Sequence, residues 1–289
     1  MKSAVLVLLL LPHVADVNTP REVRRIPGDA QAKEIRVVTW NIDHGSHLDE
    51  ITDELRSTGA DLCLLQEVDW NATRSARKDV AFELAERLGM NASFGIEFEE
   101  LSQESNDDAA YVGQATLTRL PLIKSRVLRF QHQSTFWQPH RWLPSSIPLM
   151  QRRLGNRIAL VTELKFAGHP LVVYNPHLES RSMGRIQSEQ VDEILADLQQ
   201  HYPAGTNAMI AGDINSKYFP SVFLHKMQQA GFHSALGERI ERTHKIAMAL
   251  DWIFVRGPFR LEEGNVRRSA RGSDHYPITA RLAAEGLPQ

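Results

Sequence analysis

Two short stretches decide the fold of this chain: Ile210-Ala211-Gly212-Asp213-Ile214-Asn215 and Gly272-Ser273-Asp274-His275-Tyr276-Pro277-Ile278. In each of them, apolar residues suited to a buried strand adjoin polar residues that titrate or bind metal ions. The apolar part holds the segment in a core, and the polar part then lies at the edge of a sheet. Such segments are typical of an α/β protein with a site at its strand ends.

Four more segments have the same arrangement of an apolar strand and adjoining polar residues. They are Val38-Thr39-Trp40-Asn41, Leu64-Leu65-Gln66-Glu67, Val173-Tyr174-Asn175-Pro176-His177-Leu178 and Ala249-Leu250-Asp251-Trp252-Ile253-Phe254-Val255. Strand ends that share one sheet edge bring such residues together. Carboxylate and amide oxygens with two histidines and no cysteine favour Mg²⁺ or Mn²⁺ over Zn²⁺.

A single segment of this kind carries little weight. An aspartate after a strand is often a turn or helix-cap residue, and a lone histidine is more often structural than catalytic. The set of six is different, because titratable groups seldom converge on one place without a function.

All six segments, in this order, resemble the endonuclease/exonuclease/phosphatase superfamily, and the resemblance runs over residues 35–282. The Gly-Asp-Ile-Asn segment at 212–215 and the Ser-Asp-His segment at 273–275 are the most specific. The resemblance implies a four-layer α/β sandwich, with two mixed sheets face to face and helices outside. It also implies hydrolysis of phosphoesters with a divalent cation, usually Mg²⁺.

The resemblance assigns roles to individual residues. The implied metal ligands are Glu67, Asn41 beside it, and Asp274. Among the implied catalytic residues, Asp213 orients or deprotonates the attacking water, and Asn215 steadies that water or a phosphate oxygen. His275 and His177 face the phosphate, and Asp251 fixes the tautomer of His275. Tyr111 is implied to touch the phosphate.

The chemistry of phosphodiester hydrolysis requires the same kinds of group. The reaction builds negative charge on phosphate oxygens, which a Mg²⁺ held by Glu67 offsets. A carboxylate behind an imidazole favours its cationic form, as we expect for Asp251 behind His275. In-line attack requires an oriented water, which is a task for Asp213 with Asn215.

The organisation of the 289 residues predicts one α/β domain over residues 34–284. Hydrophobic residues make up 42% of the chain and charged residues 24%, so a core of full size can form. Predicted strands are 35–40, 62–65, 113–118, 158–165, 171–174, 208–211, 253–255 and 278–282, and predicted helices are 48–55, 80–88, 185–198 and 221–230. The lone cysteine, Cys63, lies in an apolar run and is expected to be a buried hydrophobe.

Residues 1–33 are expected to be a leader and a linker. Lys2, the apolar run 4–11 and Pro12 resemble a secretory signal peptide, and the run is too short to span a bilayer. We therefore expect export to the periplasm or beyond. A leader without this role, in a cytoplasmic protein, is the alternative.

Residues 128–153 form an aromatic insertion that fits no period. It holds Trp137 and Trp142 together with three prolines, which rule out a long helix. A flap packed on the core is the favoured interpretation. The alternatives are a wall of the substrate cleft and a lipid-facing loop.

The substrate is less constrained than the reaction. A nuclease-like phosphodiesterase is favoured, and its expected phosphate contacts are Arg181, Arg185, Arg267, Arg268 and Arg271, although the net charge of -2 gives no general attraction for nucleic acid. A phospholipid or sphingolipid phosphodiesterase is the first alternative, because the aromatic insertion at 128–153 is suited to contact with lipid. A catalytically inactive binding protein is the second. Motifs expected of inositol-polyphosphate 5-phosphatases and of abasic-site endonucleases are missing. We expect a monomer.

Overall fold

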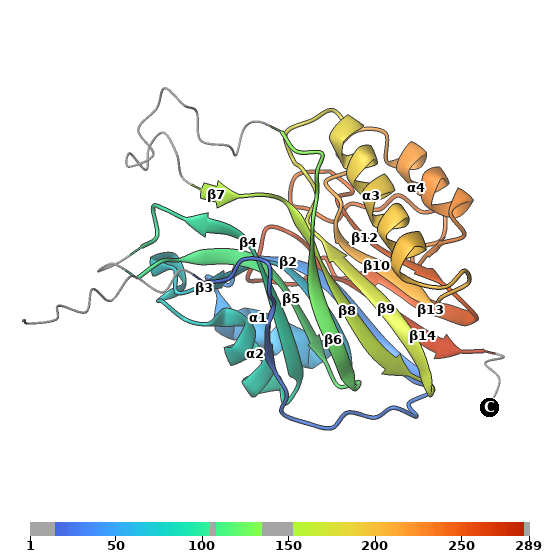
Figure 1. Ribbon diagram of the computed structural model, residues 1–289, viewed down its shortest axis with the longest axis horizontal. Coiled ribbons are helices and arrows are strands. Elements are labelled where there is room, and N and C mark those ends of the chain that lie inside the picture. The colour runs from blue at the N-terminus through green and yellow to red at the C-terminus, as the bar shows by residue number, and fades with distance from the viewer. Residues whose placement is uncertain (1–14, 105–107, 135–152, 286–289) are drawn as a thin grey trace, which may run out of the picture.

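The computed structural model describes residues 15–104, 108–134 and 153–285, which contain two β-sheets (Figure 1). The larger sheet has eight strands in the order β1-β4-β5-β3-β2-β14-β13, with β7 paired to β4. These strands are β1 (Arg21–Val23), β2 (Glu34–His44), β3 (Leu62–Trp70), β4 (Asn91–Glu100), β5 (Tyr111–Thr118), β7 (Arg153–Gly155), β13 (Phe259–Val266) and β14 (Ile278–Ala284).

The second sheet has six strands in the order β11-β12-β10-β9-β8-β6. They are β6 (Leu122–Arg129), β8 (Ile158–Phe166), β9 (His169–Pro176), β10 (Ala208–Asp213), β11 (His233–Ser234) and β12 (Asp251–Arg256). Each sheet is mixed, because β2 runs parallel to β3 and β9 parallel to β10, while the other named pairs are antiparallel.

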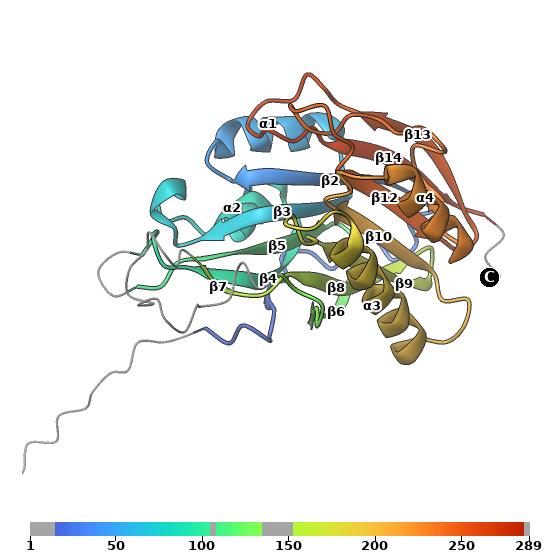
Figure 2. The ribbon, with the colours of Figure 1, turned by 90° about the horizontal axis from the view of Figure 1, so that it is seen from above.

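Helices cover the outer faces of both sheets (Figure 2). The larger sheet carries α1 (Leu48–Thr58) and α2 (Val80–Leu88), and the smaller sheet carries α3 (Arg185–His201) and α4 (Pro220–Gln229); the short 3-10 helix η1 (Thr73–Ser75) follows β3. Three apolar clusters fill the spaces between these layers, one between the sheets and one under each helical layer. The architecture is therefore the predicted four-layer α/β sandwich.

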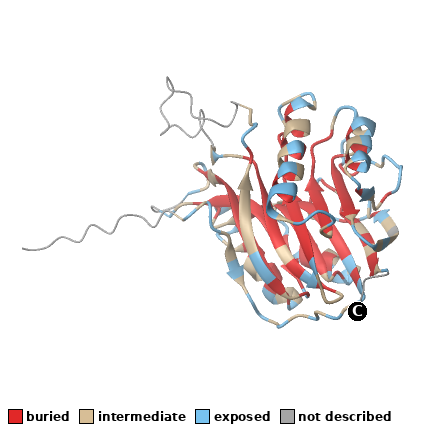
Figure 3. Cartoon of the chain, turned by 45° about the vertical axis from the view of Figure 1, so that its right-hand side comes forward, coloured by how far each residue is buried: buried red, intermediate tan, exposed pale blue. Residues whose placement is uncertain are grey.

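The central strands are apolar on both faces because both faces are buried (Figure 3). In β3, Leu62 and Leu64 point into the cluster between the sheets, whereas Cys63 and Leu65 point under α1 and α2. Burial of each such leucine contributes roughly 1.5–3 kcal/mol. This two-sided burial explains the continuous apolar run at 62–65 and the buried thiol of Cys63.

Several segments differ from the sequence-based expectation. Residues 21–23, expected to be linker, form β1 and pair with β4 at the edge of the larger sheet. The strands β4, β6 and β13 were not anticipated, because their polar residues hide the alternating pattern. Strands β2 and β3 continue beyond their apolar runs, and these extensions carry site residues.

The expected insertion is only partly described by the structure. Residues 128–129 belong to β6, and the side chain of Phe130 is buried in the cluster under α3 and α4. Trp137 and Trp142 lie outside the described residues. In the part of the chain that the structure describes, no helix is both long and apolar enough to cross a membrane.

Candidate active site

The ends of six strands, β2, β3, β9, β10, β12 and β14, deliver the candidate residues to one place. The parallel neighbours β9 and β10 end side by side, and a bridge between His177 and Asp213 continues their pairing. A Cβ atom added to Gly212 would collide with the carbonyl oxygen of Pro176, so this close approach requires glycine. Small size at Gly212 therefore helps to bring the imidazole of His177 to the Asp213 carboxylate.

Asp213 lies at the centre of the cluster. Its Oδ2 accepts a hydrogen bond from Asn41 Nδ2 at 3.2 Å and lies 3.5 Å from His177 Nε2 and 3.8 Å from His275 Nε2. Its Oδ1 accepts a bond from the backbone nitrogen of Asn215 at 2.9 Å. One carboxylate thus faces two imidazoles while an amide and a backbone N–H hold it in place.

Asn215 adopts a left-handed conformation, with φ of 52°. Its side chain donates to the carbonyl oxygen of Leu178 at 3.0 Å, which ties the loop after β10 to the loop after β9. Such conformations carry strain for residues other than glycine and are common at functional sites.

Asp251 and His275 form a buried pair. Their Oδ2 and Nδ1 atoms are 2.9 Å apart, and the backbone carbonyl of His275 accepts a bond from Trp40 Nε1 at 3.0 Å. Burial acts to lower the pKa of His275, but the carboxylate of Asp251 outweighs it and raises the pKa to about 10. The imidazole is therefore cationic at neutral pH, with its Nε2–H on the side of Asp213.

Glu67 projects from a β-bulge in β3, where its φ is 49° and the register with β5 shifts. Its Oε2 lies 3.3 Å from His44 Nε2, and its Oε1 lies 3.8 Å from His177 Nε2. Burial acts to raise the pKa of Glu67, but the two histidines together lower it. The side chain is 25% exposed, so an ion from solvent can reach this carboxylate.

Sequence reasoning missed the residues behind Glu67. His44 Nδ1 lies 3.3 Å from Asp69 Oδ1, and Arg74 binds both oxygens of Asp69, at 2.7 and 2.8 Å. Asp43, next to His44, contributes a further carboxylate. The sequence signal for this group was the Asp43-His44 pair, which follows Asn41 by two residues at the end of β2.

A second missed group supports His177. Glu97 Oε2 lies 3.2 Å from His177 Nδ1, and Glu97 Oε1 accepts a bond from Arg157 at 2.7 Å. Burial acts to raise the pKa of Glu97, but Arg157 and His177 lower it. Glu97 lies in β4 and Arg157 in the connection between β7 and β8, and nothing in either sequence segment separates a buried ion pair from a solvated one.

Two predicted site residues have other close contacts. Asp274 is 51% exposed and lies 3.1 Å from His244, whose ring meets that of His275 edge-on at 4.6 Å. Tyr111 stacks on Trp70, with ring centroids 4.9 Å apart. The structure therefore brings together seven of the nine predicted residues. It places Asp274 at the solvent-exposed border of this group and Tyr111 in the apolar cluster under α1 and α2.

The donor atoms suit a divalent cation. Side-chain atoms of Asp43, His44 and Glu67 lie within 4.8 Å of one another and are only partly buried. The amide oxygen of Asn41 lies beside this group, where it accepts a hydrogen bond from the backbone nitrogen of Asp43 at 3.2 Å. This set is rich in oxygen and negative charge, so it fits Mg²⁺ or Mn²⁺.

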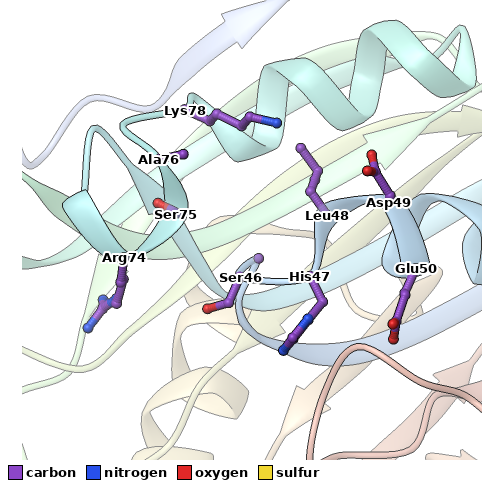
Figure 4. Close-up of a pocket in the computed structure, with 10 residues that line it drawn as sticks. Ser46, His47, Leu48, Asp49, Glu50, Arg74, Ser75, Ala76 and Lys78 are labelled. Atoms are coloured by element: carbon purple, nitrogen blue, oxygen red, sulfur yellow. The ribbon is translucent and has the colours of Figure 1, made fainter.

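A polar cleft of about 330 Å³ begins at Gly45, directly after the Asp43–His44 pair. Its other lining residues, labelled in Figure 4, are Ser46, His47, Leu48, Asp49, Glu50, Arg74, Ser75, Ala76 and Lys78. Of its cations, Arg74 is paired with Asp69 and Lys78 with Glu83. The cleft therefore offers polar contacts without a strong positive field.

An apolar pocket of about 200 Å³ lies where the loops after β9 and β10 meet. Met183, Phe219 and Val222 line it and are 70%, 67% and 66% exposed, respectively. Ser216, next to Asn215, lines it as well. The pocket thus lies between α3, α4 and the two loops that directly follow β9 and β10.

Comparison with solved structures shows the same fold. An endonuclease/exonuclease/phosphatase from Beutenbergia cavernae DSM 12333 is 18% identical, with a TM-score of 0.65, over 89% of this chain and 73% of that chain. The human Nocturnin catalytic domain with a bound sulfate anion is 20% identical, with a TM-score of 0.65, over 92% and 97%. Humanized D. rerio TDP2 is 17% identical, with a TM-score of 0.59, over 88% and 100%.

Comparison of sequences gives the family. A search of curated proteins finds no match. The sequence profile described as Endonuclease/Exonuclease/phosphatase family matches residues 38–275, from the middle of β2 to His275. The chain therefore belongs to the endonuclease/exonuclease/phosphatase family and is a phosphoric ester hydrolase.

Proposed function

We propose that this protein is a divalent-metal-dependent phosphodiesterase that acts on nucleic acid or nucleotides by in-line attack of water. The observation that carries the proposal is the convergence of one carboxylate and two imidazoles, Asp213 with His177 and His275, beside the Glu67 carboxylate. A scissile phosphate at this place meets a base, two donors and a cation site at once.

Asp213 is the group that receives a proton from the attacking water. Asn41 and the backbone of Asn215 hold its two oxygens, so the carboxylate keeps one orientation. The water oxygen bonds to phosphorus while the opposite P–O ester bond breaks. Positioning of this kind converts a bimolecular attack into an intramolecular one.

His275 and His177 act on the phosphate oxygens. The cationic His275 donates its Nε2–H toward the reacting group and supplies the proton that the leaving oxygen takes up. His177 is held by Glu97 on its other nitrogen, which directs Nε2 toward the same space. Both contacts strengthen as negative charge develops on phosphate.

The proposed cation is Mg²⁺ or Mn²⁺, held by Glu67 with Asn41 and Asp43 beside it. When bound, it supplies positive charge that offsets the charge on the phosphate oxygens. Asp274, predicted as a further ligand, contacts His244, and its charge also acts on Asp43 and His275. Its exposed carboxylate is proposed to reach the cation by a side-chain movement.

The apolar pocket supports a nucleobase as the group next to the scissile phosphate. The exposed Tyr218 and Phe219 offer aromatic rings there, and base stacking on such rings tolerates any sequence. Paired surface cations argue against a long polyanion track, since Arg185, Arg267 and Arg268 each form an ion pair with a glutamate. A nucleotide or a short or single-stranded substrate is therefore favoured.

A lipid phosphodiesterase is the second candidate, because exposed Met183, Phe219 and Val222 are also suited to an acyl chain. One experiment separates the candidates. The purified protein with Mg²⁺ or Mn²⁺ is tested on single-stranded and plasmid DNA, on dinucleotides, on sphingomyelin vesicles and on bis-p-nitrophenyl phosphate. Cleavage of nucleotides with intact vesicles supports the proposal. Cleavage of sphingomyelin alone overturns its substrate, and no cleavage of any diester overturns the activity.

A further inference from the structure

We propose that His44 contributes an imidazole nitrogen to the divalent-cation site, which makes it a mixed nitrogen–oxygen site that favours Mn²⁺ over Mg²⁺. This inference rests on the proposed function, since it concerns the cation held by Glu67. It goes further by naming a ligand that the resemblance did not imply and the class of cation that this ligand selects.

The backbone directs His44 toward Glu67. Asp43 and His44 have φ of 44° and 67°, so the chain turns sharply at the end of β2. The register between β2 and β3 shifts at this level, between Asn41 and His44, and β3 bulges at Glu67. Bulges re-aim side chains, and the two shifts together point the two side chains at one space.

The spacing of the two side chains suits a shared ion. His44 Nε2 and Glu67 Oε2 are 3.3 Å apart. Neighbouring ligands about 2.1 Å from an octahedral ion stand about 3.0 Å from each other. Asp43 places a third ligand atom within 4.8 Å of both. Only small side-chain movements are therefore required for all three to reach one cation.

The other nitrogen of His44 lies close to a carboxylate, although it makes no hydrogen bond of good geometry with it. Asp69 Oδ1 lies 3.3 Å from Nδ1, and Asp69 has no exposed side-chain surface. Arg74 holds both oxygens of Asp69. A histidine that binds a metal nearly always presents its second nitrogen to a carboxylate or carbonyl, which fixes the ring and leaves the first nitrogen as the ligand.

The consequence is a preference among cations. Oxygen-only sites suit Mg²⁺, whereas an imidazole ligand raises the affinity for first-row transition metals relative to Mg²⁺. Mn²⁺ is the weakest binder of that series and is the one that also accepts a site rich in carboxylates. A purely structural His44 that only pairs with Glu67 gives no such preference. His177 also lies near Glu67, at 3.8 Å, but its Nε2 faces Asp213 as well.

The test measures metal binding to the full chain without substrate. Calorimetry gives affinities for Mn²⁺ and Mg²⁺, and pulsed electron paramagnetic resonance of the Mn²⁺ protein detects a directly bound ¹⁴N nucleus. His44→Gln is expected to lower Mn²⁺ affinity about 10–100-fold, to lower Mg²⁺ affinity less, and to abolish the ¹⁴N signal. Asp69→Asn, which keeps the imidazole, is expected to weaken Mn²⁺ binding and retain the signal. His47→Gln, three residues away, is the matched control and is expected to change neither.

Two results overturn the inference: a wild-type protein without a ¹⁴N signal, or a signal that survives His44→Gln and disappears in His177→Gln. Glu67→Gln separates this failure from failure of the proposed function. If Glu67→Gln abolishes Mn²⁺ binding while His44→Gln does not affect it, only the role of His44 is wrong. If neither variant affects binding, the cation site itself is wrong. Unchanged circular dichroism and melting temperature establish that each variant is folded.

Discussion

The Asp251–His275 pair allows the sharpest prediction about the chemistry. The two residues are joined by one contact of 2.9 Å and are 1% and 6% exposed, so solvent does not replace a lost partner. His275→Ala is expected to lower turnover about 10²–10⁴-fold, equivalent to about 2.7–5.4 kcal/mol of activation free energy. Asp251→Asn keeps the shape but removes the charge that holds His275 cationic, and we expect it alone to cost about 10²-fold.

Groups that act as a unit are not additive. The double variant is therefore expected to be no more than about threefold slower than His275→Ala. Independent action instead multiplies the two losses. The assay is kcat/KM on bis-p-nitrophenyl phosphate at saturating Mg²⁺. His201→Ala is the control, because His201 also lies near a carboxylate, that of Asp197 at 3.3 Å, but on the exposed side of α3. Multiplicative losses would refute the inferred pair.

Three further predictions follow from the same geometry. Because the pKa of His275 is raised by folding, protonated His275 stabilises the folded state fully below pH ~6.5, and this contribution is lost as the pH rises through about 10. The free energy of unfolding, measured with urea from pH 7 to 10.5, should therefore decline in the wild type, and His275→Ala should lack this decline. Gly212→Ala should lower the melting temperature and turnover together, because the new Cβ forces Pro176 away; an active, fully stable variant would contradict this. Phe219→Ala should weaken dinucleotide binding by about 1–3 kcal/mol, measured as KM, whereas the exposed control Ile123→Ala should not.

Residues that combine a strand signal with a polar end were predictable from sequence. The apolar run 62–65, followed by Glu67, and the segments that contain Asp213 and His275 each combine an apolar strand pattern with a polar residue suited to catalysis or metal binding. The structure brings together Asn41, Glu67, His177, Asp213, Asn215, Asp251 and His275, as their positions at strand ends and the family resemblance had indicated.

The residues that sequence reasoning missed depend on tertiary geometry. His44 follows a bulge and a left-handed turn, and neither has a periodic signature. Glu97 in β4 and Arg157 just before β8 are 60 positions apart, so their pairing is visible only in the fold. Strand β4 was missed for a related reason, because buried Glu97 and Glu100 interrupt its apolar pattern.

Metal-dependent phosphodiester hydrolysis through Glu67 is the central claim, and metal depletion tests it most directly. Protein treated with EDTA is assayed on bis-p-nitrophenyl phosphate before and after addition of Mg²⁺ or Mn²⁺, together with Glu67→Gln. We predict no hydrolysis in EDTA and recovery on adding the cation. Glu67→Gln should require far more cation and turn over more slowly, with an unchanged melting temperature. Full turnover in excess EDTA, or a Glu67→Gln variant with wild-type metal dependence, would contradict the account.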